Sequence, residues 1–278
     1  MSDPSPSSPA AAMPFLEAEF DLPPAAGPVR SYIIASTPRS GSMLLCDLLL
    51  ATGRMGVPAE YFKQRDMIAP MAGRLGLALP VGMGTYVREL LRRRATANGV
   101  FGAKIHIQQA WGVIAQPNFR RYLAGSRFVW LRRRDVMAQA VSMAIAMRTN
   151  LWFRPRGSAD TPRPAAAAKG GPGSVDIGAL FDALGMIRAE NDFWQRFFQI
   201  NGIRPLEVTY EDVLADPGPP VAAICRLMDV DPGPAPRLDQ SRFEAQSGGD
   251  GSAWREGLVR MLRVVDERRG GDAARETR

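Results

Sequence analysis

Short apolar runs alternate along this chain with longer segments of helical periodicity. Residues 31–36 (S-Y-I-I-A-S) are continuously apolar in their middle and predict a short buried strand. Residues 42–52 then place apolar side chains on most faces of a predicted helix, which Gly53 ends. Two further apolar runs, 100–107 and 127–132, predict additional strands. A strand, a tight turn and a buried helix in this order predict the first unit of an α/β sheet.

The remainder of the chain continues this alternation. Asp135 stands where a helix cap belongs, directly after the strand predicted at 127–132. The pattern predicts an exposed basic helix at 85–96, helices at 135–147, 181–200 and 211–229, and a strand at 205–209. Strands that alternate with helices favour a parallel sheet covered by helices on both faces. The predicted fold class is therefore α/β.

The ends of the chain differ in composition from its middle. Residues 1–28 are rich in Ser, Pro and Ala and lack the basic start and apolar run of a signal peptide, which predicts a disordered extension. A single domain is predicted over 29–262, with a flexible Pro-, Ala- and Gly-rich loop at 155–174 and a charged tail at 263–278. No apolar run approaches the roughly 20 residues that a transmembrane helix needs. These features predict a cytoplasmic protein without a membrane span.

Composition narrows the chemistry that the chain can perform. It contains two cysteines, Cys46 and Cys225, and one histidine, His106, which argues against a disulfide framework and a metal centre. Carboxylates, hydroxyls, lysine, arginine and backbone amides remain as reactive groups. The net charge of +7 favours anionic partners such as nucleic acid or a phosphorylated nucleotide, although abundant arginine in an Ala-, Gly- and Pro-rich chain also accounts for it.

The turn at residues 36–42 (S-T-P-R-S-G-S) joins a predicted strand to a predicted helix. Backbone N–H groups, hydroxyls and the helix N-terminus converge there, which suits a phosphate, and Arg39 adds a fixed charge. The alternative interpretation is an ordinary capped turn. A kinase or ATPase loop requires Lys after its last glycine, whereas Gly41 is followed by Ser42. Triphosphate hydrolysis and a small-molecule kinase are therefore disfavoured.

A second cationic motif lies at residues 130–135 (W-L-R-R-R-D), followed by 139–142 (Q-A-V-S). An arginine that leaves a strand and a serine about two helical turns further on can converge on one group. The alternative interpretation is a solvated corner of the sheet.

With these motifs the chain resembles the sulfotransferases, and most closely the bacterial trehalose sulfotransferase family. The shared blocks keep their order and spacing, and they are R-S-G-S (39–42), G-V-P-A-E-Y-F (56–62), G-A-K (102–104), R-R-D (133–135) with Q-A-V-S (139–142), and V-T-Y-E-D (208–212). Each block is weak by itself, and together they are specific. The resemblance implies a P-loop NTPase-like parallel sheet flanked by helices.

The resemblance also implies a donor and its binding residues. The donor would be 3'-phosphoadenylyl sulfate (PAPS), the product 3'-phosphoadenosine 5'-phosphate (PAP), and no metal would take part. The 5'-phosphosulfate would lie on the loop Pro38, Arg39, Ser40, Gly41 and Ser42, and the 3'-phosphate on Arg133 and Ser142. Arg134 is a reserve candidate for the 3'-phosphate, because other sulfotransferases place their arginine one residue nearer the serine.

Glu60 matches the catalytic carboxylate of the family, which would act as general base on the acceptor hydroxyl. Its neighbours in sequence, a proline and two aromatic residues, predict partial desolvation and therefore a raised basicity. His106 is the competing base, because Lys104-Ile105-His106 resembles the K-x-H of cytosolic animal sulfotransferases. Lys104 and His106 would share one face of a strand, and Lys104 could stabilise the bridging oxygen as it leaves.

The acceptor implied by the resemblance is a hydroxyl of a carbohydrate or glycolipid. Val57 stands where trehalose-specific members carry a second carboxylate, which argues against trehalose itself. Trp111 and Trp152 could stack on a sugar ring or pack in the core. The alternative function is a non-catalytic nucleotide- or nucleic-acid-binding protein, but we favour an enzyme with no nucleic-acid partner. Related enzymes can form homodimers, so the resemblance also implies that this chain can form one.

Overall fold

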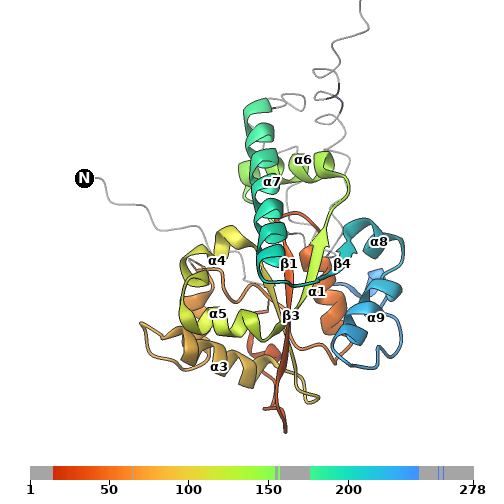
Figure 1. Ribbon diagram of the computed structural model, residues 1–278. Coiled ribbons are helices and arrows are strands. Elements are labelled where there is room, and N and C mark those ends of the chain that lie inside the picture. The colour runs from red at the N-terminus through yellow and green to blue at the C-terminus, as the bar shows by residue number, and fades with distance from the viewer. Residues whose placement is uncertain are drawn as a thin grey trace, which may run out of the picture.

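The protein is built on a parallel sheet, as a computed structural model shows (Figure 1). The structure describes residues 15–64, 66–153, 156, 176–243, 256 and 259. Within these residues the sheet has four strands in the order β2-β1-β3-β4: β1 (Arg30–Ser36), β2 (Val100–Ile105), β3 (Ser126–Arg132) and β4 (Leu206–Thr209). All neighbouring strands run parallel, which confirms the predicted fold class.

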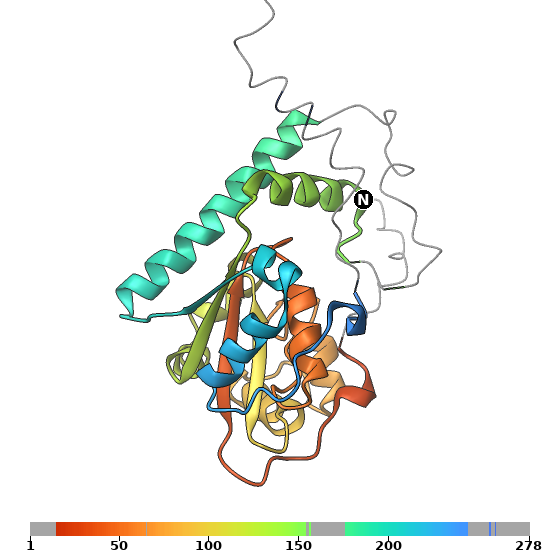
Figure 2. The ribbon, with the colours of Figure 1, turned by 90° about the vertical axis from the view of Figure 1, so that its right-hand side faces the viewer.

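Helices cover both faces of this sheet. Figure 2 shows α7 on one face and α1 and α9 on the other. The helices described are η1 (Ala18–Phe20), α1 (Ser42–Ala51), α2 (Ile68–Arg74), α3 (Met83–Arg94), α4 (Ile107–Ile114), α5 (Pro117–Ala124), α6 (Val136–Thr149), α7 (Ile177–Ile200), α8 (Tyr210–Ala215), α9 (Gly218–Leu227) and η3 (Leu238–Gln240).

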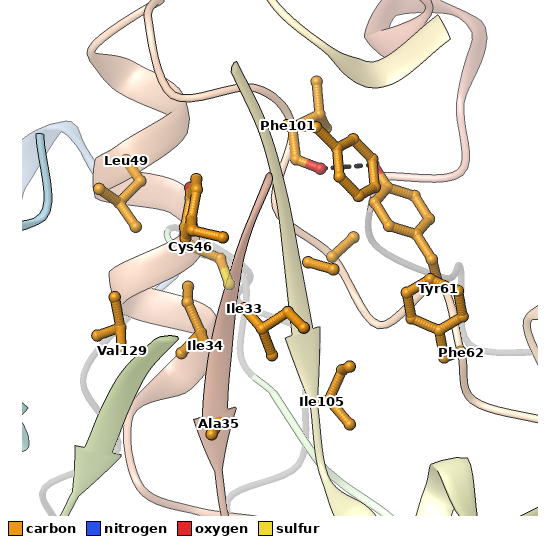
Figure 3. Packing of buried hydrophobic residues seen from close by; sticks show 14 of the residues in the cluster. Ile33, Ile34, Ala35, Cys46, Leu49, Tyr61, Phe62, Phe101, Ile105 and Val129 are labelled. Atoms are coloured by element: carbon orange, nitrogen blue, oxygen red, sulfur yellow. Dashed lines mark hydrogen bonds between the residues drawn. The ribbon is translucent and has the colours of Figure 1, made fainter. Parts of the chain in front are cut away.

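The central strand β1 lies in the densest part of the core. All of its residues after Arg30 are buried, as expected of a strand with neighbours on both sides and helices on both faces. Figure 3 shows Cys46 of α1 beside Ile34 of β1, while Tyr61 and Phe62 lie beyond β2. Since the strands are parallel, their carboxyl ends meet at one edge of the sheet, where ligands bind in open α/β folds.

Two predicted elements end earlier than expected. The helix predicted at 211–229 is two helices, α8 and α9, because Pro217 interrupts the backbone ladder between them. The strand predicted at 100–107 ends at Ile105, because His106 is the N-cap residue of α4. Neither α4 nor α5 was expected from the sequence pattern.

The N-terminal segment is not a free extension where the structure describes it. The prediction of disorder over 1–28 is wrong for residues 15–28, because Phe15 and Phe20 are buried. Arg94 anchors the segment: its Nη1 donates to the Phe15 carbonyl at 2.8 Å, and its Nη2 lies 3.0 Å from Asp21 Oδ1. Arg94 is fully buried, so the basic helix α3 is amphipathic and not exposed all round.

Two predicted segments fall largely outside the described residues. The loop predicted at 155–174 is described only at Arg156, whose guanidinium donates to the carbonyls of Ser241 and Leu238. The tail predicted at 263–278 lies wholly outside them. Among the helices that the structure does describe, none combines the length and apolar character needed to cross a membrane.

Candidate active site

The turn between β1 and α1 has a backbone that depends on Gly41. Gly41 has φ 83°, and a Cβ atom there would lie 2.2 Å from the ring of Tyr210. Glycine is therefore required both for its conformation and for the close approach of the ring. Arg39 also has a positive φ, 64°, and Ser40 Oγ donates to the Thr37 carbonyl at 2.7 Å. The turn is thus a compact loop at the N-terminus of α1.

Helix α6 holds this loop from the side. Gln139 Nε2 donates to Thr37 Oγ1 at 2.6 Å and to the Pro38 carbonyl at 2.7 Å. Arg39 Nε donates to Ser142 Oγ at 2.9 Å. The two predicted anion-binding motifs, which are about 100 residues apart in sequence, therefore form one continuous cluster.

Two guanidinium groups lie together at this cluster. Arg133 Nη1 lies 3.4 Å from the Arg39 carbonyl, and the guanidinium stacks 4.7 Å from the centre of the Tyr210 ring. Arg133 Nε is buried and has no hydrogen-bond partner among the described residues. Burial and the charge of Arg133 lower the pKa of Arg39 to about 10, against the opposite effect of Tyr210. Paired cations beside a helix N-terminus are well suited to bind an anion.

Arg134, the reserve candidate, lies at the surface and makes other contacts. Its Nη1 lies 3.0 Å from Asp212 Oδ1, and its backbone N–H donates to Glu211 Oε2 at 3.0 Å. Glu211 also accepts from the backbone N–H of Asp135 at 3.1 Å and so fixes the end of β3. The V-T-Y-E-D motif therefore holds Arg134 with its carboxylates and covers Gly41 with its tyrosine.

A second cluster, which we call the carboxylate cluster, comprises Glu60, Lys104 and His106. A parallel bridge between Ala59 and Ala103 sets Glu60 beside β2. Glu60 Oε1 lies 2.6 Å from Lys104 Nζ and 3.4 Å from His106 Nε2. Lys104 and His106 are buried, whereas the side chain of Glu60 keeps about a fifth of its surface, 21%, exposed. The structure thus unites the three predicted catalytic residues around one carboxylate oxygen.

The predicted rise in the basicity of Glu60 is wrong for this arrangement. Burial acts to raise the pKa of Glu60, but the charge of Lys104 and the contacts with His106 outweigh it. The pKa is therefore held well below the ordinary glutamate value. Sequence neighbours indicated desolvation correctly but could not reveal the ammonium group that opposes it.

His106 connects the carboxylate cluster to the loop between β1 and α1. Its Nδ1 lies 2.9 Å from the Ser36 carbonyl, which can only accept, so Nδ1 carries the proton. The other ring nitrogen, Nε2, faces Glu60. Ser36 directly precedes the loop, so the two clusters are adjacent at the carboxyl edge of the sheet. Within the described ranges no group of three or more His, Cys, Asp or Glu side chains could hold a metal ion.

Sequence reasoning missed one residue of this region, Glu190 in the middle of α7. It is only 2% exposed. Burial raises its pKa to about 7, the imidazole of His106 and the backbone N–H of Gln108 oppose this rise, and Glu60 adds to it. The signal was present in the sequence, because Glu190 falls on the buried stripe of α7 together with Ile187 and Trp194.

The residues considered for acceptor binding differ in how far they are buried. Val57 is buried, with 1% of its surface exposed. Trp111 and Trp152 are both exposed, so neither packs in the core. The carbonyl of Trp152 accepts a hydrogen bond from the guanidinium of Arg39, which places this residue beside the loop.

Comparison with known proteins agrees with the motifs. The model of the Stf0 sulphotransferase family matches residues 31–257. The trehalose 2-sulfotransferase of Mycobacterium tuberculosis (strain ATCC 35801 / TMC 107 / Erdman) is 28% identical over 251 residues, which cover 76% of this chain and 90% of that protein. The trehalose 2-sulfotransferase of Mycolicibacterium smegmatis is 25% identical over 244 residues, which cover 74% and 87% of the two chains.

A solved structure, a sulfotransferase from Alicyclobacillus acidocaldarius, aligns with 85% of this chain and 92% of its own, at 14% identity and a TM-score of 0.45. That likeness is too distant to carry an argument. The family match is different, because it spans most of the chain and every motif discussed above. The chain therefore belongs to the Stf0 sulphotransferase family, as the sequence motifs predicted.

Proposed function

We propose that this protein transfers a sulfuryl group from PAPS to a hydroxyl of a carbohydrate or glycoconjugate. One observation carries the proposal: the contact between His106 and Ser36 joins the loop with its two arginines to the carboxylate cluster. A donor held by the loop would thus have its reactive end near a carboxylate and a buried lysine. Family membership supports the reaction class.

The loop supplies the groups that a phosphosulfate requires. Backbone N–H groups at the start of α1 and the hydroxyl of Ser42 would bind the 5'-phosphosulfate, while Ser40, whose hydroxyl donates to the Thr37 carbonyl, would hold the loop in shape. Arg133, with its unused Nε donor, and Ser142 would bind the 3'-phosphate. Arg39, which already donates to Ser142, would add its charge at the 5'-phosphosulfate.

The carboxylate cluster supplies the groups that the transfer requires. Glu60 would take the proton of the acceptor hydroxyl while that oxygen bonds to sulfur. The bond between sulfur and the bridging phosphate oxygen would break, and its electron pair would leave on PAP. Lys104 would neutralise the charge that develops there. Movement of Lys104 toward the leaving oxygen would also remove its charge from Glu60 and raise the basicity of that carboxylate.

The acceptor class follows from the relatives and from this chain's own residues. The two curated relatives are named for trehalose. Val57 is apolar and buried, so it offers no hydrogen bond to a sugar hydroxyl. We therefore propose a carbohydrate other than free trehalose.

Calorimetric titration with PAP tests the donor site through a matched pair of variants. Arg133→Ala should weaken PAP binding by about 10- to 100-fold, since it removes a charge-assisted hydrogen bond. Arg134→Ala, its neighbour, should change the affinity less than about threefold, because that side chain contacts Asp212 and not the loop. No binding of PAP by the wild type, or equal effects of the two variants, would contradict the proposal.

A further inference from the structure

We propose that a cavity between α3, α5 and residues 24–29 binds a phosphate or sulfate ester that carries an apolar body. This cavity, which we call the arginine cavity, has a volume of about 870 Å³. Sites for small ligands usually have volumes of about 300 to 1,000 Å³. The inference does not depend on the proposed function, because no residue that lines the arginine cavity belongs to the loop between β1 and α1 or to the carboxylate cluster.

The arginine cavity lies at the amino edge of the sheet, opposite the candidate active site. Val29 in its wall directly precedes β1, and Tyr122 lies shortly before β3 begins at Ser126. The helices α3 and α5 lie side by side at this edge (Figure 1). The loop of the candidate active site follows the other end of β1, a strand of seven residues, which is about 20 Å long at about 3.3 Å per residue. A ligand in the arginine cavity would therefore be neither the donor nor the acceptor.

Three arginines line the arginine cavity, and none of its described lining residues is acidic. Arg88 and Arg92 belong to α3, and Arg121 belongs to α5. Arg92 Nε pairs with Glu89 Oε2 at 2.7 Å, whereas neither Arg88 nor Arg121 forms an ion pair within the described ranges. Guanidinium groups bind phosphate and sulfate oxygens through paired hydrogen bonds. The charge of the lining therefore favours an anion of this kind.

Apolar side chains form another part of the wall. Val29, Val87 and Leu91 line the arginine cavity, together with Pro24 and Ala25 of the N-terminal segment. Val87 is buried, and Val29 and Leu91 are half-buried against the hydrophobic core. Each methylene group of a ligand that is buried on such a surface should strengthen binding by about fourfold. Arginines beside an apolar wall thus favour an amphipathic anion over inorganic phosphate.

The alternative interpretation is that these arginines form only a solvated basic surface on α3 and α5. Arg120 separates the two interpretations, because it is the neighbour of Arg121 on α5, is also exposed and does not line the arginine cavity. On a solvated surface the two arginines would attract an anion equally. In a binding site only Arg121 would contact it.

Calorimetric titration of the whole chain with decyl phosphate, below its critical micelle concentration, tests the inference. Decyl phosphate should bind at least about tenfold more tightly than butyl phosphate, because its longer chain buries more methylene groups. Arg88→Ala and Arg121→Ala should each weaken binding by about 5- to 20-fold, and Arg120→Ala by less than about twofold. No binding by the wild type, equal affinity for the two esters, or equal effects of Arg121→Ala and Arg120→Ala would overturn the inference.

A steric variant tests the same cavity without a change of charge. Gly82 lines it, has φ −68°, which any residue can adopt, and a Cβ atom there would meet no atom within 4 Å. Gly82→Phe should therefore fold and should weaken decyl phosphate binding by at least about tenfold. Gly73→Phe is the matched control, because a Cβ at Gly73 also meets no atom within 4 Å and this residue does not line the cavity. Undiminished binding by Gly82→Phe would overturn the inference.

Two further measurements locate the ester and identify its source. Arg133→Ala should bind decyl phosphate as the wild type does, and loss of binding in this variant would place the ester on the loop and overturn the inference. Sedimentation with vesicles of phosphatidylcholine and phosphatidylglycerol distinguishes a lipid headgroup from a free ester. Cosedimentation that Arg121→Ala weakens would support a membrane lipid as the ligand. Decyl phosphate binding without cosedimentation would support a free soluble ester.

Discussion

Two carboxylates of this protein, Asp47 and Glu60, pair with cations in different ways. Asp47 of α1 is 3% exposed; its Oδ1 accepts from Nε and Nη2 of Arg242 at 2.8 and 2.6 Å. Its Oδ2 accepts from the backbone N–H of Arg242 and from Ser241 Oγ. Glu60 Oε1 lies 2.6 Å from Lys104 Nζ and 3.4 Å from His106 Nε2, and the side chain keeps part of its surface exposed.

The difference predicts a structural role for the Asp47–Arg242 pair and a reactive role for the Glu60–Lys104 pair. Both oxygens of Asp47 are saturated, so the pair joins α1 to the segment at 241–243 and offers nothing to a substrate. The Glu60 side chain keeps about a fifth of its surface exposed, and Lys104 could move from it to another partner. We therefore expect the saturated Asp47 pair to stabilise the fold and the partly exposed Glu60 pair to take part in the proposed transfer.

Removal of the Glu60 charge should produce the largest effect. Glu60→Gln keeps the shape of the side chain but cannot accept the acceptor proton, so kcat for sulfate transfer should fall by about 10²- to 10⁴-fold. PAP affinity, measured by calorimetry, should remain within about threefold of the wild-type value, since Glu60 is not part of the anion site. Equal losses of kcat and PAP affinity would contradict the proposal that the loop binds the nucleotide and the carboxylate cluster acts in the transfer.

The matched change at the structural pair should act on stability. Asp47→Asn leaves Arg242 without its carboxylate, and we expect the free energy of unfolding to drop by about 2–3 kcal/mol, a moderate value because Arg242 is partly exposed. Chemical denaturation measures the change. The kcat of the folded variant should stay within about twofold of wild type. If the variant were stable but had lost sulfate transfer, Asp47 would take part in the reaction and its proposed structural role would be wrong.

Alanine substitutions at two glycines with a positive φ should have the smallest effect, and this effect is a loss of stability. Gly41→Ala introduces a Cβ into the Tyr210 ring at a positive φ, and it should destabilise the protein by about 2 kcal/mol. Gly53→Ala shares the positive φ but meets no atom within 4 Å, so its effect should be about 1 kcal/mol. The Tm of each variant and its protection by PAP measure the difference. Equal shifts would mean that the Tyr210 contact is unimportant.

The sequence pattern predicted the central sheet well, because each strand is a short apolar run followed by a recognisable turn or cap. It failed where a local signal depends on a distant partner. Phe15 and Phe20 belong to a Pro- and Ala-rich segment, yet they are buried because Arg94 and Asp21 hold that segment against α3. The helices α4 and α5 were missed because eight-residue elements give little periodicity.

The candidate site, like the fold, could be predicted from the sequence only in part. Motifs placed Arg39, Arg133 and Glu60 in the site, since each belongs to a short block with its own spacing. The direction of the pKa shift at Glu60 required the position of Lys104, and the burial of Glu190 required the packing of α7 against the rest of the fold. Ion pairing and helix crossing bring together residues that are distant in sequence, so a short stretch of sequence cannot reveal them.

Transfer of radiolabelled sulfate from PAPS to a panel of sugars and glycolipids, with trehalose included, decides whether this protein is a sulfotransferase that uses Glu60 as its base. We expect a labelled product with the wild type and almost none with Glu60→Gln, while both proteins bind PAP. PAP binding without transfer to any acceptor, or undiminished transfer by Glu60→Gln, would contradict this expectation.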